Sequence, residues 1–305
     1  MFTFILKRLL IIIPMALLVV TLTWVLIRIA PGNFYSGEKK LPAAVEANIR
    51  QQYGLDKPWY TQYGLLMANI VQGNFGASLR YTDTTVNEII ARHLPYSATL
   101  GVLAYLLALL IGISAGTISA LRQNSGFDYS SMSLAMLGLS VPSFVLGPLL
   151  VLVFSLWLYW FPPARWGGIS ALVLPVITLS AVYAAYIARL TRAGMLEVLR
   201  SDYIRTARAK GLDEKTVLFR HAFRGGLIPV ISFTGPALAG LLAGTIVVER
   251  VFAIPGLGNI FIQAVTNRDE PLVLGITAFL SILIMVFNLI VDIAYGFLDP
   301  RIRYE

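Results

Sequence analysis

Six long apolar runs constrain the fold of this 305-residue chain more than any other feature of its sequence. A helix needs about 20 mostly apolar residues to cross the hydrocarbon core of a bilayer. The runs of about this length or longer are Leu9–Ile29, Tyr96–Leu121, Ser131–Tyr159, Ile169–Ile187, Leu227–Val248 and Pro271–Leu298. Charged residues make up 13% of the chain, whereas about 25% is usual for a soluble domain, and the mean hydropathy is +0.74. We therefore expect an all-α polytopic membrane protein with six transmembrane helices.

The first apolar run is expected to stay in the protein as a transmembrane helix within residues 1–30. Lys7 and Arg8 precede it, as the basic residues of a secretory signal would. A cleaved signal, however, has an apolar core of roughly 7–15 residues followed by small residues at the cleavage site. This run is longer, and Ala30-Pro31-Gly32 is a poor cleavage context.

The basic residues predict that both termini lie in the cytoplasm. One group of short segments holds Lys7, Arg8, Arg122, Arg301, Arg303 and the nine basic residues between Arg189 and Arg224, whereas the short loops opposite hold Arg165, Arg250 and Arg268. Basic residues in short loops mark the cytoplasmic side of a membrane protein. The same distribution accounts for the net charge of +8 without a nucleic-acid partner.

Residues 31–95 are expected to form a small helical cap on the extracytoplasmic side, between the first and second spans. Three stretches have residues typical of helix starts and stops: Pro42–Gly54, Pro58–Gly73, and a third that Asp83 or Thr84 would cap and that runs to His93. Such a cap is too small for a solute-binding core of its own. We expect a separate binding protein to dock there.

The remaining residues, 96–305, are expected to form a five-helix transmembrane core with a cytoplasmic loop at 189–228. The loop should continue the fourth span helically through Met195 and Tyr203-Ile204 and break at Gly211. Asp213 would cap a second short helix, and Gly225-Gly226 would close it. Two short helices bent around a glycine would form a rigid projection that another protein can grip.

This loop reads Tyr203-Ile204-Arg205-Thr206-Ala207-Arg208-Ala209-Lys210-Gly211-Leu212 and later Arg220-His221-Ala222. It resembles the coupling loop of ABC-type importer membrane subunits, whose general form is Glu-Ala-Ala, three residues, then Gly. Here Arg205-Thr206-Ala207 replaces Glu-Ala-Ala, and Arg220-His221-Ala222 replaces the usual Ile-x-Leu-Pro. Both departures are the form seen in the peptide-permease branch. A basic amphipathic loop lying on anionic lipid stays open as an alternative.

The resemblance extends over nearly the whole chain. The matching segments are Ile29–Gly32, Gly54–Pro58, Gly73–Ser78, Pro255–Gly258, Asn267–Asp269 and Asp299–Arg301. Gly37–Pro42 is similar to the oligopeptide version of the B-type subunit more than to the dipeptide or nickel versions.

The resemblance implies a type I ABC importer-like fold in the bacterial cytoplasmic (inner) membrane. It implies a permease subunit of an ATP-driven peptide importer that forms half of the translocation pathway. Its partners would be a C-type membrane subunit in a heterodimer, two ATPase subunits that hold ATP and Mg, and an extracytoplasmic peptide-binding protein. An importer subunit for nickel, an opine or another small solute, or a secondary carrier, stays open.

The resemblance also assigns residues to the contact with the ATPase. They are Tyr203, Arg205, Thr206, Ala207, Arg208, Lys210, Gly211, Leu212, Arg220 and His221. Arg205, Arg208 and Lys210 would face acidic groups of the ATPase. Ala207 and Gly211 would allow close approach.

Prolines and small polar residues predict a second set of sites, lining the pathway. Ser140, Pro142 and Ser143 interrupt the third span, and Pro229 and Pro236, the latter after Gly235, interrupt the fifth. Backbone groups freed at membrane depth survive next to other helices or a water-filled cavity. Ordinary kinks remain the alternative.

The sequence does not favour an enzyme. It has no Gly-x-x-x-x-Gly-Lys-Ser/Thr loop for ATP, no cysteine and no clustered metal ligands, so we expect no catalytic residue, cofactor or metal in this chain. Gly112-Ile113-Ser114-Ala115-Gly116 fits a hydrolase pattern but lies inside a span, with His93 and His221 near opposite faces of the membrane. Close helix packing explains Gly112 and Gly116 better, and Gly240 and Gly244 repeat their spacing.

Asp292 is the clear acid within a predicted span. It lies seven residues before Asp299, or roughly 10 Å of helix, so we expect it nearer the cytoplasmic face than the bilayer centre. Pairing with a loop arginine is the favoured interpretation, and a role in substrate or proton movement is the alternative.

Overall fold

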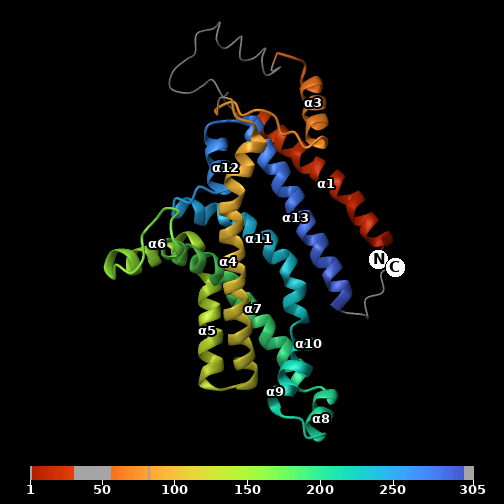
Figure 1. Cartoon of the computed structure of the whole chain (residues 1–305), viewed down its shortest axis with the longest axis vertical. Coiled ribbons are helices and arrows are strands. Elements are labelled where there is room, and N and C mark those ends of the chain that lie inside the picture. The colour runs from red at the N-terminus through yellow and green to blue at the C-terminus, as the bar shows by residue number, and fades with distance from the viewer. Residues whose placement is uncertain (1, 31–55, 82, 299–305) are drawn as a thin grey trace. The chain divides into compact units, whose positions relative to one another are not determined.

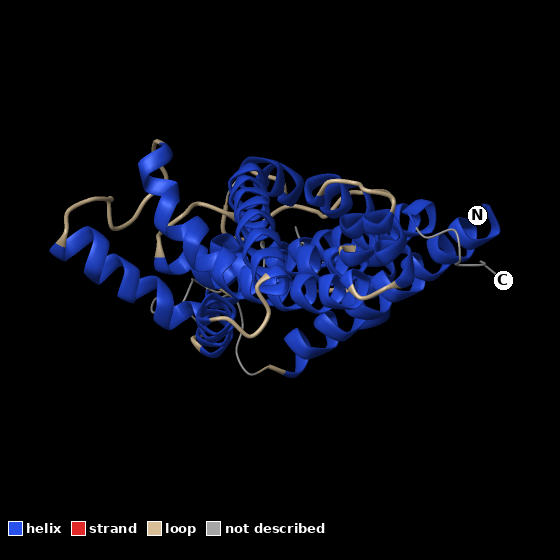
Figure 2. Ribbon diagram, turned by 90° about the horizontal axis from the view of Figure 1, so that it is seen from below, coloured by secondary structure: helices blue, strands red, loops and turns tan. Residues whose placement is uncertain are grey.

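The computed structural model describes residues 2–30, 56–81 and 83–298, and their regular structure is helical apart from one β-bridge between Ala77 and Thr85 (Figures 1 and 2). The helix expected over Pro42–Gly54 lies outside these residues. The chain divides into two compact units. Unit 1 comprises Met1–Pro95 and Gly256–Val286, and unit 2 comprises Tyr96–Pro255 and Phe287–Glu305.

The helices follow one another along the whole described chain. They are α1 (Phe2–Ile29), α3 (Trp59–Val71), α4 (Val86–Leu121), α5 (Gly126–Ser140), α6 (Ser143–Leu150), the π-helix η1 (Val151–Trp157), α7 (Ile169–Leu199), α8 (Asp202–Ala209), α9 (Glu214–Thr216), the π-helix η2 (Val217–Ala222), α10 (Phe223–Gly226), α11 (Ile228–Val251), α12 (Leu257–Thr266) and α13 (Glu270–Leu298).

Four helices are long and apolar enough to cross a membrane: Leu10–Ile29, Val86–Leu121, Ile169–Leu199 and Glu270–Val291. Two bent pairs also qualify if each counts as one span: Gly126–Ser140 with Ser143–Trp157, and Ile228–Leu241 with Thr245–Val251. The all-α polytopic class is therefore confirmed. The count of six spans stays a prediction, because it depends on how the bent pairs lie in the bilayer.

The third predicted span is broken into two helices that meet at an angle of 107°. Val141, at the end of α5, is extended with φ −89° and ψ 113°. The residue before a proline is disfavoured in the helical conformation, and Pro142 is the N-cap of α6 with ψ 146°. The sequence therefore bends the chain sharply here.

Unit 1 packs α1, α3, the start of α4, α12 and most of α13 around two apolar clusters. Val86, Ile89, Ile90, Leu257, Ile260 and Leu272 belong to the first, and Val20, Trp24, Ile70 and Leu274 to the second. The helix expected over Pro58–Gln72 is confirmed as α3, with Pro58 at its N-cap. Gly73 follows α3 with φ +73°, a conformation that suits glycine.

The third short helix expected outside the membrane is not a separate element. Its residues form the first turns of α4, which runs as one helix through Pro95 to Leu121 (Figure 1). Thr85, and neither Asp83 nor Thr84, caps it. The Glu88 N–H donates to Thr85 Oγ1 at 3.2 Å, and the Thr85 N–H donates to Glu88 Oε2 at 3.2 Å. This reciprocal capping box satisfies two N–H groups that a helix start leaves unpaired.

Unit 2 is organised around α7, and small residues allow the neighbouring helices to approach α7 closely. A Cβ added to Gly116 of α4 would lie 2.4 Å from the Ala188 carbonyl oxygen, and one added to Gly112 would lie 2.7 Å from Ile187 Cβ. The structure thus supports close packing as the reason for these two glycines.

Candidate functional site

The segment between α7 and α11, residues 200–227, is the candidate site, and we refer to it as the α8–α10 segment. It lies at the far end of α7 (Figure 1). The expectation that α7 continues helically through Tyr203-Ile204 is wrong. α7 ends at Leu199, and Ser201 is extended with ψ 154° before α8 starts at Asp202. The Ser201 hydroxyl donates to the Val198 carbonyl at 2.6 Å, a local bond typical of serine near helix ends.

The α8–α10 segment has its own apolar core. Ile204 and Ala207 of α8 are buried with Val217 and Ala222 of η2 against Met195 of α7. Ala207 keeps 6% of its surface exposed, so its methyl group faces the interior of the segment. α8 is therefore packed onto the end of α7 through this apolar cluster.

Gly211 ends α8 as expected, and its backbone requires a glycine-like conformation. Its φ is +78°. The Gly211 N–H donates to the Arg208 carbonyl at 2.9 Å and the Leu212 N–H to the Ala207 carbonyl at 3.4 Å. These two bonds form a Schellman motif. A Cβ added to Gly211 would meet no atom within 4 Å.

Asp213 starts the next helix, as its sequence position predicts. The Thr216 N–H donates to Asp213 Oδ2 at 3.2 Å. Hydrogen bonds from the Thr216 side chain and then from its backbone N–H favour the ionised carboxylate, and they hold the pKa of Asp213 below its usual value. The cap fixes the direction in which the chain leaves Gly211.

The charged side chains of the α8–α10 segment divide into paired and outward-facing groups. Arg208 Nε lies 2.8 Å from Glu214 Oε1, and this hydrogen-bonded pair raises the pKa of Arg208. Arg205 makes an exposed contact of 3.3 Å with Asp202. The exposed face carries Tyr203, Arg205, Thr206, Lys210, Gly211, Leu212 and Arg220, and His221 is half-buried. Arg208 is thus held by Glu214 within the chain, a pairing that sequence reasoning missed.

Gly226 clamps the end of the segment to α7. A Cβ added to Gly194 would lie 2.3 Å from the Gly226 carbonyl oxygen, and one added to Gly226 would lie 2.4 Å from Met195 Sδ. Gly225-Gly226 closes the helix as expected, because α10 ends at Gly226 and α11 starts at Ile228. Gly194 was not identified from the sequence. Its signal was a glycine inside a helical stretch, which usually has a packing reason.

The candidate pathway residues lie at two places in unit 2, the break between α5 and α6 and the helix α11. Ser140, Pro142 and Ser143 lie together at the break between α5 and α6, where Ser140 and Pro142 are exposed and Ser143 is half-buried. Pro229 does not interrupt a span: it occupies the first turn of α11, where a missing N–H leaves no bond unmade. Pro236 is exposed inside α11. Asp292 belongs to α13, and its side chain lies outside those that the structure describes.

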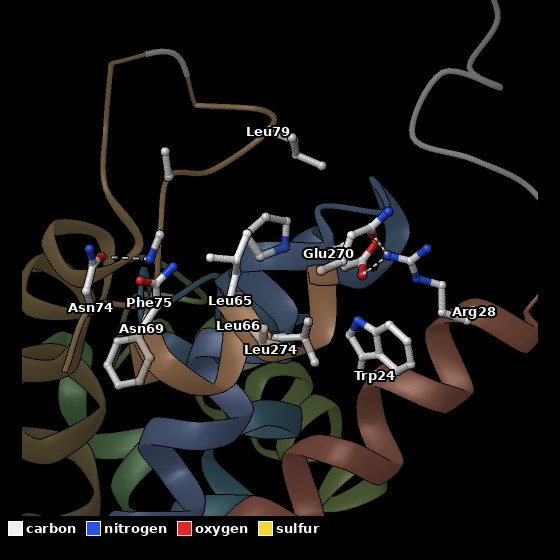
Figure 3. Close-up of a pocket in the computed structure, with 14 residues that line it drawn as sticks. Trp24, Arg28, Leu65, Leu66, Asn69, Asn74, Phe75, Leu79, Glu270 and Leu274 are labelled. Atoms are coloured by element: carbon white, nitrogen blue, oxygen red, sulfur yellow. Dashed lines mark hydrogen bonds and ion pairs between the residues drawn. The ribbon is translucent and has the colours of Figure 1, made fainter. Parts of the chain in front are cut away.

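Unit 1 contains a hollow of about 230 Å³ that sequence reasoning did not anticipate (Figure 3). Arg28 of α1 and Glu270 of α13 point toward one another there, with 3.4 Å between Nη2 and Oε1. The Arg28 guanidinium also lies 4.9 Å from the ring centroid of Trp24. This pair joins the first and last long helices within unit 1.

Side chains of the types that bind metal ions are dispersed over the described part of the chain. Within it, no group of three or more His, Asp or Glu side chains lies close enough together to hold a metal ion.

Long apolar helices, with a compact and partly exposed segment between two of them, define a class: a multi-pass membrane protein. Comparison with protein families makes this specific. Residues 108–304 match the "Binding-protein-dependent transport system inner membrane component" model, and residues 1–101 match the corresponding N-terminal model. The chain belongs to this family of inner-membrane transport components.

Curated relatives match over the full length. The "Oligopeptide transport system permease protein OppB" of Salmonella typhimurium is 46% identical over 306 residues, covering 100% of both chains. Its counterpart of the same name in Haemophilus influenzae is 45% identical with the same coverage. The "Dipeptide transport system permease protein DppB" of Bacillus subtilis is 42% identical over 287 residues, which cover 94% of this chain and 93% of that one.

A solved structure supports the fold. "Inward facing conformations of the MetNI methionine ABC transporter" matches with a TM-score of 0.57 and 16% identity, over 69% of this chain and 96% of that one. The type I ABC importer-like fold expected from the sequence is therefore confirmed. The family match and the apolar helices confirm the location as a multi-pass protein of the inner membrane.

Proposed function

We propose that the chain is the B-type membrane subunit of a peptide importer that ATP hydrolysis on other subunits drives. The observation that carries the proposal is 46% identity, over the full length of both chains, to a protein named as an oligopeptide permease. Membership in a binding-protein-dependent family argues against a secondary carrier that works alone.

The proposed complex adds three kinds of partner to this chain. A C-type membrane subunit supplies the second half of the pathway, two ATPase subunits bind ATP and Mg, and a peptide-binding protein delivers the substrate. On this proposal the part of the chain that contains α3 faces outward, between the first two spans. The chain itself contributes one half of the pathway and a surface that the ATPase contacts.

The exposed face of the α8–α10 segment is the proposed contact surface for the ATPase. Arg205 and Lys210 are exposed cations suited to acidic groups on an ATPase, and Tyr203 and Leu212 keep 49% and 40% of their surfaces exposed. Exposed aromatic and apolar side chains beside cations are typical of protein interfaces. Phe219 of η2 is also exposed, at 64%, and was not anticipated from the sequence.

Ala207 and Arg208 have a supporting role in this proposal. The buried methyl group of Ala207 keeps α8 close to η2, and Glu214 holds the Arg208 guanidinium across the turn. They make the segment rigid, so that a push on its face becomes rigid-body motion of α7. Motion of the spans would open the pathway, where the broken helix at Ser140–Ser143 offers polar groups to the peptide backbone.

Purification of the tagged chain from its native membrane tests the proposal. We expect a second membrane subunit and ATPase subunits to co-purify, and the complex to hydrolyse ATP faster when the peptide-loaded binding protein is added. Stimulation by a nickel chelate or an opine, and not by peptides, would move the assignment to another solute. Solute transport by a complex that lacks an ATPase would overturn it.

A further inference from the structure

A buried ion pair joins α5 to α7 near the α8–α10 segment. Arg192 of α7 donates from Nε to Asp128 Oδ1 at 2.7 Å and from Nη2 to Asp128 Oδ2 at 2.7 Å. The Asp128 side chain is 2% exposed and that of Arg192 is 26% exposed. A guanidinium that uses two N–H groups on one carboxylate fixes the orientation of both side chains.

Asp128 also accepts hydrogen bonds from the part of the chain that precedes it. Ser119 of α4 donates its hydroxyl to Asp128 Oδ1, and the Asn124 N–H donates to Oδ2 at 2.9 Å. Asn124 has φ +61° in the turn between α4 and α5. One carboxylate therefore ties the end of α4, the turn and the start of α5 to α7.

Stability alone is a weak explanation for such a pair. Desolvating two charges costs much of what their attraction returns, so buried ion pairs contribute little net stability. Removing one partner, in contrast, leaves a buried group unpaired. What the arrangement secures is a fixed geometry between α5 and α7.

The ion pair lies between the proposed contact surface for the ATPase and the proposed pathway. Arg192 precedes Gly194 and Met195, which are packed on Gly226 and in the core of the α8–α10 segment. Asp128 lies in the first turn of α5, and Ser140 ends the same helix at the break before α6. Twelve residues of helix separate these two, or about 18 Å.

We propose that Asp128 and Arg192 are positioning residues for transport: they make α5 follow α7, so that motion of the α8–α10 segment reaches the break at Ser140–Ser143. The inference rests on the proposed function and names a part of its machinery. It assigns to α5 the role of transmitting motion from the ATPase contact surface to the pathway.

The test uses the whole complex in lipid vesicles, with both membrane subunits, the ATPases and the binding protein. Asp128→Asn, Arg192→Gln and the double variant are compared by peptide carried per ATP hydrolysed. We expect each single variant to lower this ratio by about 2-fold to 30-fold, the range for substitutions along a coupling route. The double variant should be no worse than the more severe single variant, because the two residues act as a pair.

Two further variants separate positioning from folding. Arg192→Lys keeps the charge but loses the two-pronged contact, and we expect it to fold and still to lower the ratio. Arg28→Gln removes the ion pair with Glu270 in unit 1. This matched control should lower the thermal unfolding midpoint and leave the ratio unchanged.

A wild-type ratio in Arg192→Lys or in the other folded variants would overturn the inference, and so would additive effects in the double variant. Failure of the proposed function would look different. In that case the wild-type complex itself would show no peptide uptake linked to ATP hydrolysis.

Discussion

At the scale of single residues, Gly211 gives the sharpest prediction. Its φ is +78°, and an added Cβ would meet no atom of this chain within 4 Å. We expect Gly211→Asp to fold and insert, at a backbone cost of roughly 1–2 kcal/mol, but to lose ATP-linked uptake. The new carboxylate would hold an ATPase away from the cationic face. Uptake and ATP hydrolysis, measured in the same vesicles, check this.

Gly73 provides a matched control for backbone strain. Its φ is +73°, and an added Cβ there also meets nothing within 4 Å. Gly73→Asp should therefore destabilise the chain as much as Gly211→Asp does, while the ATPase subunits still co-purify with the chain. Full transport by Gly211→Asp would refute the coupling role of the turn.

A second residue-scale prediction concerns Gly194. A methyl group there would lie 2.3 Å from the Gly226 carbonyl oxygen, which is backbone and cannot turn aside. We expect Gly194→Ala to lower the unfolding free energy by about 1–3 kcal/mol, as overpacking does. Gly101→Ala, on α4 with nothing within 4 Å, should be neutral or stabilising. Equal unfolding midpoints for the two variants would contradict the close contact of α7 and α10.

At the scale of elements, the break between α5 and α6 can be probed directly because the chain has no cysteine. A charged thiol reagent reacts only with a thiol that water reaches. We expect Ser143→Cys to react, and its rate to change when ATP is added. We expect lipid to cover Leu134 of α5, which is 68% exposed, so Leu134→Cys should not react. Equal reactivity of the two would rule out a water-filled pathway at the break.

Local signals in the sequence predicted several element ends correctly. Pro58 and Gly73 bound α3, and Gly211 and Asp213 form the turn after α8. Each of these residues acts on its own backbone, so its effect can be read without knowing the fold. The capping box of Thr85 and Glu88 was equally local and was overlooked, and the start of α4 was therefore misplaced.

Other features depend on tertiary contacts and could not be predicted. α7 stops at Leu199 because α8 turns back to bury Ile204 and Ala207 against Met195. The chain between them carries no proline or glycine that would announce a break. Likewise, Asp128 and Arg192 are 64 residues apart, and no spacing rule relates them.

At the scale of the whole molecule, the chain has the features of a transport subunit that works together with other subunits. Its family is binding-protein-dependent, its α8–α10 segment is packed on α7 and carries exposed cations, and its sequence has no phosphate-binding loop. Transport should therefore depend on subunits that bring ATP hydrolysis and substrate capture. The residue-scale and element-scale predictions all presuppose that division of labour.

Peptide uptake into lipid vesicles tests this division most directly. Vesicles are prepared with this chain alone, and with this chain together with the second membrane subunit, the ATPases and the peptide-binding protein. We expect labelled peptide to accumulate only in the second preparation, and only while ATP is hydrolysed. Uptake by the chain alone, without any nucleotide-hydrolysing companion, would contradict the proposed function.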